Sequence, residues 1–227
     1  MSTRLPSGWV IRATGSPADL QRIADDLGDG DLHVNVDGDS LYLISPDIDK
    51  MDSQATAEWA GYELVRLISA AASLRFGIVL QVQFQSVQPK SDPIPSGYRF
   101  QSNGYKVRNG YSVLQAVTAA QHRSNVRTAL LACAAGGADG LFRAYEALCS
   151  ELMSTANLDY SGGIGTREWL IKQGWVDEQE EQRFLDTVVH YGRQNSSPSF
   201  RTSSPGEAQR LVEKLLGKWI DHISQLA

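Results

Sequence analysis

Three residues within one predicted helix, residues 178–191, could perform acid–base chemistry on a phosphodiester. Arg183 and His190 are seven residues apart. Seven residues make about 700° of helix, within about 20° of two full turns, so both side chains share one face. Asp186, one turn before His190, could orient the imidazole. A cation that stabilises a phosphorane and a histidine that moves a proton are what metal-free RNA cleavage requires. An ion-paired, solvent-facing helix would show the same pattern, and this alternative stays open.

A second candidate site is the stretch 93–138, which contains no Asp or Glu and interleaves aromatic residues with cations. Aromatic rings that stack on bases, combined with cations that contact phosphates, would suit single-stranded nucleic acid. The residues that would make these contacts are Tyr98, Arg99, Lys106, Arg108, Arg123 and Arg127. The alternative is a strand-and-turn region whose tyrosines pack on the adjacent helix, and the negative charge of the whole chain favours it.

Charge is distributed unevenly along the chain. The 227 residues include 21 Lys+Arg and 26 Asp+Glu, which gives a formal net charge of −5. This composition is typical of a globular protein and excludes wholesale disorder and a highly basic nucleic-acid coat protein. Segment 19–52 alone holds ten acids and two cations, a net charge of 2 − 10 = −8. The acidic segment and the acid-free, basic stretch could dock onto a partner protein or onto a second copy of the chain.

The sequence lacks the common motifs for cofactors, metals and membranes. No P-loop, dinucleotide-binding or Gly-x-Ser-x-Gly pattern occurs. The 4 histidines and 2 cysteines do not stand at metal-ligand spacing. We therefore expect no cofactor and no metal. No run approaches the roughly 18 apolar residues of a membrane span, and no signal-peptide pattern opens the chain. We expect a cytoplasmic protein that does not enter a membrane.

The first half of the chain predicts an α+β domain, residues 1–110, with a small antiparallel or mixed sheet and a long helix. Strands are predicted at 8–14, 32–36, 41–44 and 78–84, and a short edge strand at 98–101. The second and third strands form a hairpin around Gly38. Helices are predicted at 18–27, after the N-cap Ser16 and Pro17, and at 53–75, ended by Gly77.

Strand signals disappear from about residue 114, and the remaining pattern predicts an all-helical domain, residues 111–227. Helices are predicted at 112–135, 138–153, 167–173, 178–191 and 206–226. The last of these is the clearest, because a capping-box sequence at 204–207 precedes one continuous apolar stripe that ends at Ile223.

Residues about 138–224 resemble the C-terminal helical domains of certain bacterial and phage proteins, which in turn resemble HEPN-like helical domains. The residues that carry the resemblance are Phe142-Arg143-Ala144-Tyr145-Glu146, Ile171-Lys172-Gln173-Gly174-Trp175, Glu181-Gln182-Arg183-Phe184, Thr187, His190, Gly192-Arg193, Glu207-Ala208, Leu215-Leu216 and Trp219. The resemblance implies an all-helical domain that often dimerises.

The resemblance implies one of two functions, RNA cleavage or protein interaction. Some HEPN-like domains are metal-independent ribonucleases, many of them in toxin–antitoxin or anti-phage systems, and others are non-catalytic interaction domains. Their catalytic signature is an arginine followed by a histidine after four to six residues, a spacing that Arg183 and His190 satisfy. One position departs from this signature, because Phe184 stands where a polar residue usually follows the arginine. The related bacterial and phage proteins also place an Arg-His pair shortly after the Gly-Arg, whereas Gln194 follows Arg193 here.

The leading hypothesis from the sequence is therefore a non-catalytic interaction or assembly subunit of a prokaryotic defence or toxin–antitoxin-type system, bound to a protein partner or to itself. The first alternative is a metal-independent HEPN-type ribonuclease that uses Arg183, Asp186 and His190. The second alternative is a single-stranded nucleic-acid binder, with RNA as one candidate ligand.

Overall fold

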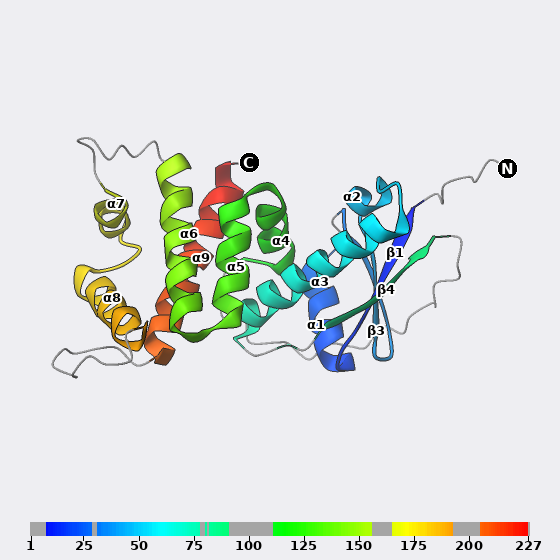
Figure 1. Ribbon diagram of the computed structural model, residues 1–227, viewed down its shortest axis with the longest axis horizontal. Coiled ribbons are helices and arrows are strands. Elements are labelled where there is room, and N and C mark those ends of the chain that lie inside the picture. The colour runs from blue at the N-terminus through cyan, green and yellow to red at the C-terminus, as the bar shows by residue number, and fades with distance from the viewer. Residues whose placement is uncertain are drawn as a thin grey trace. The chain divides into compact units, whose positions relative to one another are not determined.

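A computed structural model describes residues 8–28, 31–77, 80, 82–90, 111–155, 165–192 and 205–226 of the chain. The chain divides into two compact units. The first consists of Met1–Arg108 with Ser112–Val117, and the second of Asn109–Tyr111 with Thr118–Ala227. Strands occur in the first unit, and the described part of the second is helical (Figure 1). The predicted α+β class is therefore confirmed.

The first unit is built on a four-stranded antiparallel sheet. Its strands are β1 (Trp9–Thr14), β2 (His33–Asp37), β3 (Ser40–Ile44) and β4 (Gln83–Pro89), in the order β2-β3-β1-β4. In the register, Ile11 of β1 lies opposite Leu43 of β3 and Val87 of β4. With a helix after β1 and another between β3 and β4, this connectivity is the split βαβ, or ferredoxin-like, arrangement.

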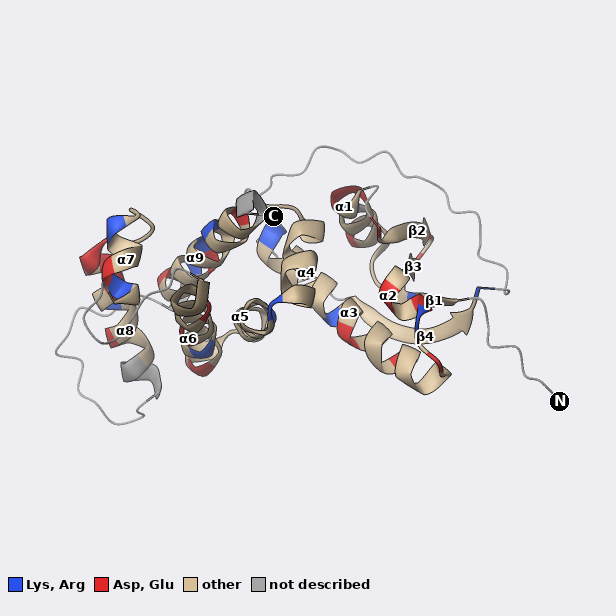
Figure 2. Ribbon diagram, turned by 90° about the horizontal axis from the view of Figure 1, so that it is seen from above, with Lys and Arg blue, Asp and Glu red and all other residues tan. Residues whose placement is uncertain are grey.

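Two helices, α1 (Pro17–Leu27) and α3 (Gln54–Phe76), lie on one face of this sheet (Figures 1 and 2). Each begins at a serine whose Oγ accepts a backbone N–H three residues later, Ser16 for α1 and Ser53 for α3, as N-cap residues do. Gly77 ends α3 in the left-handed conformation, at φ 66° and ψ 28°. Both predicted helices are confirmed to within two residues at each end.

Gly61 allows α3 to approach the sheet closely. A Cβ atom at this position would lie 3.1 Å from Val87 Cγ2, 3.2 Å from Ile11 Cγ1 and 3.2 Å from Phe84 Cε2. Because the helix contacts β1 and β4 at this point, Ile11 and Val87 lie on the helix-covered face and are fully or almost fully buried.

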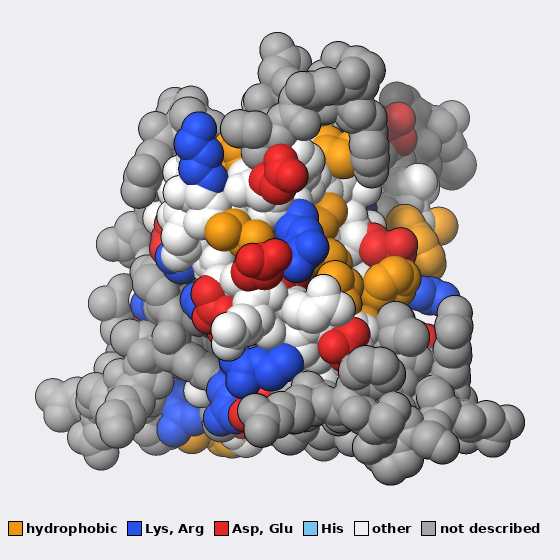
Figure 3. All heavy atoms as spheres, turned by 90° about the vertical axis from the view of Figure 1, so that its left-hand side faces the viewer, with side chains coloured by type: hydrophobic (Ala, Val, Ile, Leu, Met, Phe, Trp, Pro, Cys, Tyr) orange, Lys and Arg blue, Asp and Glu red, His pale blue; other side chains and the backbone are white. Residues whose placement is uncertain are grey.

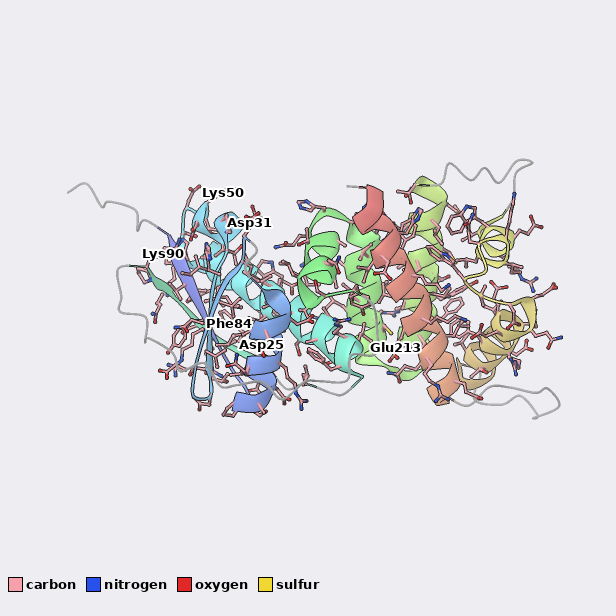
Figure 4. All side chains as sticks on the ribbon, turned by 180° about the vertical axis from the view of Figure 1, so that it is seen from behind. Asp25, Asp31, Lys50, Phe84, Lys90 and Glu213 are labelled. Atoms are coloured by element: carbon pink, nitrogen blue, oxygen red, sulfur yellow. The ribbon has the colours of Figure 1, made fainter. Side chains whose placement is uncertain are left out.

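A short helix, α2 (Pro46–Asp49), was not predicted. Its sequence signal is the same serine–proline pair that precedes α1, here Ser45 and Pro46. Asp49 accepts the backbone N–H of Trp9 at 3.0 Å and pairs with Lys90, while Trp9 Nε1 donates to the Met51 carbonyl at 3.0 Å. These contacts join α2 to the start of β1 and to the end of β4, where Figure 4 labels Lys90.

The predicted strand at 78–84 is wrong in position, because β4 begins only at Gln83 and continues to Pro89. Leu80 is buried but does not join the sheet. Its backbone N–H donates to Ser73 Oγ at 3.1 Å, and its carbonyl accepts from Ser69 Oγ at 3.2 Å. The side chains of α3 therefore take the backbone groups that a strand would have paired. The edge strand predicted at 98–101 lies outside the described residues.

The second unit is made of helices. They are α4 (Val113–His122), whose first residues belong to the first unit, α5 (Ser124–Ala135), α6 (Gly137–Thr155), α7 (Thr166–Lys172), α8 (Glu178–Gly192) and α9 (Pro205–Leu226). The single helix predicted at 112–135 is wrong, because Arg123 is extended at φ −133° and ψ 107° and separates α4 from α5. The other four helices are confirmed to within two residues at their ends. The apolar stripe of α9 is buried around Trp219.

Candidate functional site

Helix α8 is continuous from Glu178 to Gly192 and therefore includes all three residues predicted to be catalytic. Arg183 is exposed, and its Nε donates to the Gln179 carbonyl of the same helix at 3.2 Å. Asp186 is half-buried, and its Oδ1 accepts from Gln182 Nε2 at 3.0 Å. The side chain of His190 lies outside the described residues, so the geometry of the Asp186–His190 pair stays a prediction.

A groove of about 300 Å³ lies between α8 and α9. Arg183 and Glu180 line it from α8, and Glu207, Arg210 and Lys214 line it from α9. Its base is apolar, formed by Phe184, Ala208 and Leu211, all of them buried. Lys214 Nζ pairs with Glu180 Oε2 across the groove at 2.9 Å. Acidic and basic side chains alternate with hydrophobic ones on the face that α7 and α8 present (Figure 3).

A buried polar cluster around Glu181 was missed by the sequence analysis. Glu181 is 0% exposed, although it is a carboxylate on a helix whose neighbouring positions are largely polar. It accepts hydrogen bonds from the Tyr145 hydroxyl of α6 and from Arg167 Nε of α7, the latter at 2.5 Å. The cluster therefore links three helices that are distant in the sequence, and no local pattern indicates it.

The environment of this cluster shifts the pKa of its members. Burial raises the pKa of the Cys149 thiol to about 12. Burial, together with the nearby Cys149 and Glu181, raises the pKa of Tyr145 above its ordinary value of 10.0. The hydrogen bond to Glu181 raises the pKa of Arg167. Near neutral pH the cluster thus contains a neutral phenol, a neutral thiol and a cationic guanidinium, which fits a structural role better than a nucleophilic one.

The predicted nucleic-acid contacts are only partly described. Tyr98, Arg99, Lys106 and Arg108 lie outside the described residues. Arg123 pairs with Glu151 of α6, from Nη1 to Oε1 at 2.8 Å, and the same carboxylate accepts from Asn125 at 3.1 Å. Arg127, half-buried on α5, lies one turn after Arg123. Because Arg123 already pairs with a buried carboxylate, it would bind a phosphate more weakly than an isolated cation would.

The face of the sheet opposite α1 and α3 offers no stacked platform for bases among the described residues. Four-stranded sheets of RNA-recognition modules stack bases on exposed aromatic rings. Here Ile11 faces α3, so Val10 and Arg12 lie on the opposite face, and Tyr42 lies beside Arg12 on that face. Tyr42 is only 8% exposed and Val10 is 0% exposed. Among the described residues, the aromatic ring at the centre of this face, Tyr42, is therefore almost fully buried.

An exposed group of aromatic side chains on α3 and β4 was also missed by the sequence analysis. Trp59 is 67% exposed and Tyr62 is 41% exposed. The Tyr62 ring centroid lies 6.0 Å from that of Trp59 and 6.1 Å from that of Phe84, which it meets edge-on, and Arg66 lies 5.6 Å above the Tyr62 ring. We call Trp59, Tyr62, Arg66 and Phe84 the α3–β4 aromatic surface; Figure 4 labels Phe84.

The sequence did hold a signal for this surface. Trp59, Tyr62 and Arg66 are spaced by three and four residues, so they share one helical face. That face lies opposite Ile68 on the helix, and Ile68 is fully buried. A solvent-facing stripe that contains tryptophan and tyrosine rather than charged residues alone is the feature that could have been recognised.

The described part of the chain shows no site for a metal and no membrane-spanning helix. No group of three or more His, Cys, Asp or Glu side chains in these segments is arranged to hold a metal ion. None of the helices described is both long and apolar enough to cross a bilayer.

Comparison with protein-family models, with curated proteins and with solved structures finds no match to this chain. The molecule is thus defined by its own architecture, a split-βαβ α+β unit followed by a helical unit. Within the described segments, its candidate functional features are the α3–β4 aromatic surface, the groove between α8 and α9, and the α8 residues.

Proposed function

We propose that the protein is a non-catalytic interaction subunit that binds another protein molecule through the α3–β4 aromatic surface. The observation that carries the proposal is the exposure of Trp59 and Tyr62, whose rings lie beside each other, together with the edge-on contact of Tyr62 with Phe84. Contiguous exposed apolar patches on soluble proteins commonly mark interaction sites. Tryptophan, tyrosine and arginine are also the residues most enriched at the energetic centres of protein interfaces.

Two side chains of the surface are held by contacts within the chain itself. Arg66 Nη1 pairs with Glu63 Oε1 at 2.9 Å while its guanidinium lies over Tyr62. Phe84 is held on β4, beneath the close approach of Gly61. Side chains fixed in this way lose less conformational entropy on association, which leaves more of the apolar burial to stabilise the complex.

The proposal includes the cellular setting that the HEPN-like resemblance implies. The subunit would act in the cytoplasm of a prokaryote, in an assembly of the defence or toxin–antitoxin type. The replacement of the usual polar residue by Phe184, which is buried in the helical unit, supports a non-catalytic role for that unit.

Affinity purification under native conditions tests the proposal. Wild-type protein should retain a specific partner or a second copy of itself, and Trp59→Ser should lose it. Phe142→Ser is the matched control, because Phe142 is another exposed aromatic residue, at 38% exposure, on α6. Equal recovery of the same partner with wild type and Trp59→Ser would contradict the proposal.

A metal-independent ribonuclease is the second candidate function. It is favoured by one observation, that Arg183 lines a groove together with the cations Arg210 and Lys214, where a phosphodiester could be held. Arg183 would stabilise the phosphorane, His190 would transfer the proton and Asp186 would orient His190. Cleavage of mixed RNA in EDTA should then be lost in Arg183→Ala and in His190→Ala. Activity that survives either substitution contradicts this assignment.

A further inference from the structure

We infer that the α3–β4 aromatic surface binds an extended segment of a different protein, which adds to the sheet as a further strand beside β4. This inference rests on the function proposed above and specifies the conformation of the partner at that surface. β4 is the last strand in the order β2-β3-β1-β4, and no other strand of the described segments pairs with its outer edge. An unpaired strand edge is a template for another extended chain.

The backbone of β4 presents hydrogen-bonding groups at this outer edge. The Lys90 N–H donates to the Gly8 carbonyl at 3.1 Å, and bonded and non-bonded residue pairs alternate along an antiparallel ladder. Pro89 therefore has a non-bonded position, which suits a residue without an N–H, and so does Val87, opposite Ile11. The N–H and C=O of Val87 thus point away from β1, and they form no hydrogen bond with any described residue.

The sequence of β4 permits a further strand and favours a partner of different sequence. The strand, QFQSVQP, contains none of the charged residues that commonly protect strand edges. A second copy fits less well. A two-fold pairing centred on Val87 would place Pro89 of each copy opposite Gln85 of the other, so that a residue without an N–H faces the bulge at Gln85 at both ends.

Helix α3 places its aromatic flank along the same edge. Gly61 faces the sheet, and Tyr62, about 100° further round the helix, meets Phe84 of β4 edge-on. Arg75 lies about 40° from Gly61 in the opposite direction, and it pairs with Asp26 of α1 at 3.3 Å. The flank that carries Tyr62 therefore faces away from α1 and lies over the edge strand.

An extended segment matches both the backbone and the side chains of this site. A strand beside β4 would lie about 4.8 Å from it, with every second side chain on the helix side of the sheet. These side chains would contact Tyr62 and Phe84, and the larger ones would reach Trp59, so we expect apolar residues at alternate positions. A helical segment could cover the same rings, but it would leave the N–H and C=O of Val87 without partners, which costs free energy once water is excluded.

Peptide selection on the full chain tests the inference. The probe is a library of random heptapeptides displayed on phage, which matches the 7 residues of β4. Selected peptides should carry apolar side chains at alternate positions. Tyr62→Ser should weaken their binding at least about tenfold in fluorescence polarisation, because aromatic residues commonly dominate the binding energy of interfaces. Phe142→Ser, at the exposed aromatic residue of α6, should leave it unchanged.

N-methylation of a selected peptide tests the backbone pairing itself. Methyl groups on one alternating set of peptide nitrogens should weaken binding at least about tenfold, and methyl groups on the other set should not, because only one set donates to the strand edge. Equal effects of the two sets, or apolar residues spaced by three and four, would overturn strand addition. Failure to select any peptide that distinguishes wild type from Tyr62→Ser would also overturn it.

The outcomes separate the inference from the proposed function. If Trp59→Ser releases the native partner but no peptide binds in this way, the partner docks through a folded surface, and only strand addition is lost. A chain that sediments as a dimer and is dissociated by the selected peptide would assign the edge to a second copy, which overturns the inference. If Trp59→Ser retains the partner and no peptide is selected, both the inference and the proposed function are contradicted.

Discussion

Glu181 is stabilised inside the helical unit by two donors from different helices. Its carboxylate is fully buried and receives the Tyr145 hydroxyl and the Arg167 guanidinium. A carboxylate removed from water is tolerated only when hydrogen bonds and an opposite charge compensate for the lost hydration. The side chains of this cluster therefore decide how α6, α7 and α8 fit together.

Tyr145→Phe tests this cluster at the level of one hydrogen bond. The substitution removes the hydroxyl donor to Glu181 while it retains the ring that packs 5.1 Å from Phe184. We expect the free energy of unfolding to fall by about 1–2 kcal/mol, since a buried acceptor loses one of its partners. Urea unfolding measures this free energy. Tyr62→Phe is the control, because Tyr62 is exposed. Equal stability of the two variants would contradict the account.

The raised pKa of Cys149 predicts an unreactive thiol. With a pKa of about 12, almost no thiolate forms in the folded protein at pH 8, and thiolate is the form that reacts. Ellman's reagent should therefore label Cys149 much more slowly in the native protein than in denaturant, as mass spectrometry of the labelled peptides would show. Rapid labelling of Cys149 in the folded chain would contradict the burial that raises its pKa.

The same shift makes stability depend on pH in the alkaline range. The unfolded thiol loses its proton near its ordinary value of 9.0, whereas the folded thiol keeps it to about 12. Above pH 9 the unfolded state thus binds fewer protons than the folded state, so the contribution of Cys149 to stability falls as the pH rises from 9 towards 12. Cys149→Ala should unfold with a shallower pH dependence in this range; an unchanged dependence would contradict the shift.

Among the secondary-structure elements, α3 lies close against β1 and β4 at Gly61. Gly61→Leu should destabilise the first unit by about 1–3 kcal/mol, because even a Cβ would lie 3.1–3.2 Å from three core side chains. Ala55→Leu is the matched control, since Ala55 is exposed on the same helix. Thermal melts compare the two variants, and a melting temperature of Gly61→Leu at or above that of the control would contradict the close packing.

Local sequence signals predicted most of the elements. Serine N-caps lie within the segments that form α1 and α3, and an apolar stripe lies within α9, so the local sequence was sufficient to predict these three helices. The local sequence did not predict the position of β4 correctly. The apolar run that ends at Phe84 has strong strand propensity, but the backbone of Leu80 is held by Ser69 and Ser73 of α3. The hydrogen bonds of Leu80 to α3 therefore explain why β4 begins at Gln83, later in the sequence than predicted.

Contacts between residues distant in the sequence also explain two features of the helical unit that the sequence did not predict, the break between α4 and α5 and the Glu181 cluster. No glycine or proline separates α4 from α5, and the extended residue between them, Arg123, pairs with Glu151, which is 28 residues away. The Glu181 cluster likewise depends on three helices meeting. The α3–β4 aromatic surface is different, because the spacing of Trp59, Tyr62 and Arg66 was present in the sequence.

The whole molecule offers two kinds of surface for association with a protein partner, one of charged side chains and one of exposed aromatic side chains. Acidic positions gather on α1 and α2 (Figure 2), whereas Arg123, one cation of the basic stretch, is already paired within the helical unit. An interface centred on Trp59 should therefore persist at about 0.5 M salt, where exposed charges are screened within a few ångströms but apolar burial is not. Dissociation of the complex at this salt concentration, followed by sedimentation velocity, would contradict an aromatic interface and favour an electrostatic one.

Site-specific photo-crosslinking in cells tests most directly whether the α3–β4 aromatic surface is a protein interface. The photoreactive residue p-benzoylphenylalanine would replace Trp59 in one variant and Phe142, another exposed aromatic residue, in the control. The account predicts one discrete crosslinked adduct from position 59 and none from position 142, and the mass of the adduct distinguishes a second copy from a different protein. The absence of an adduct at position 59, or the same adduct at both positions, would contradict the central claim.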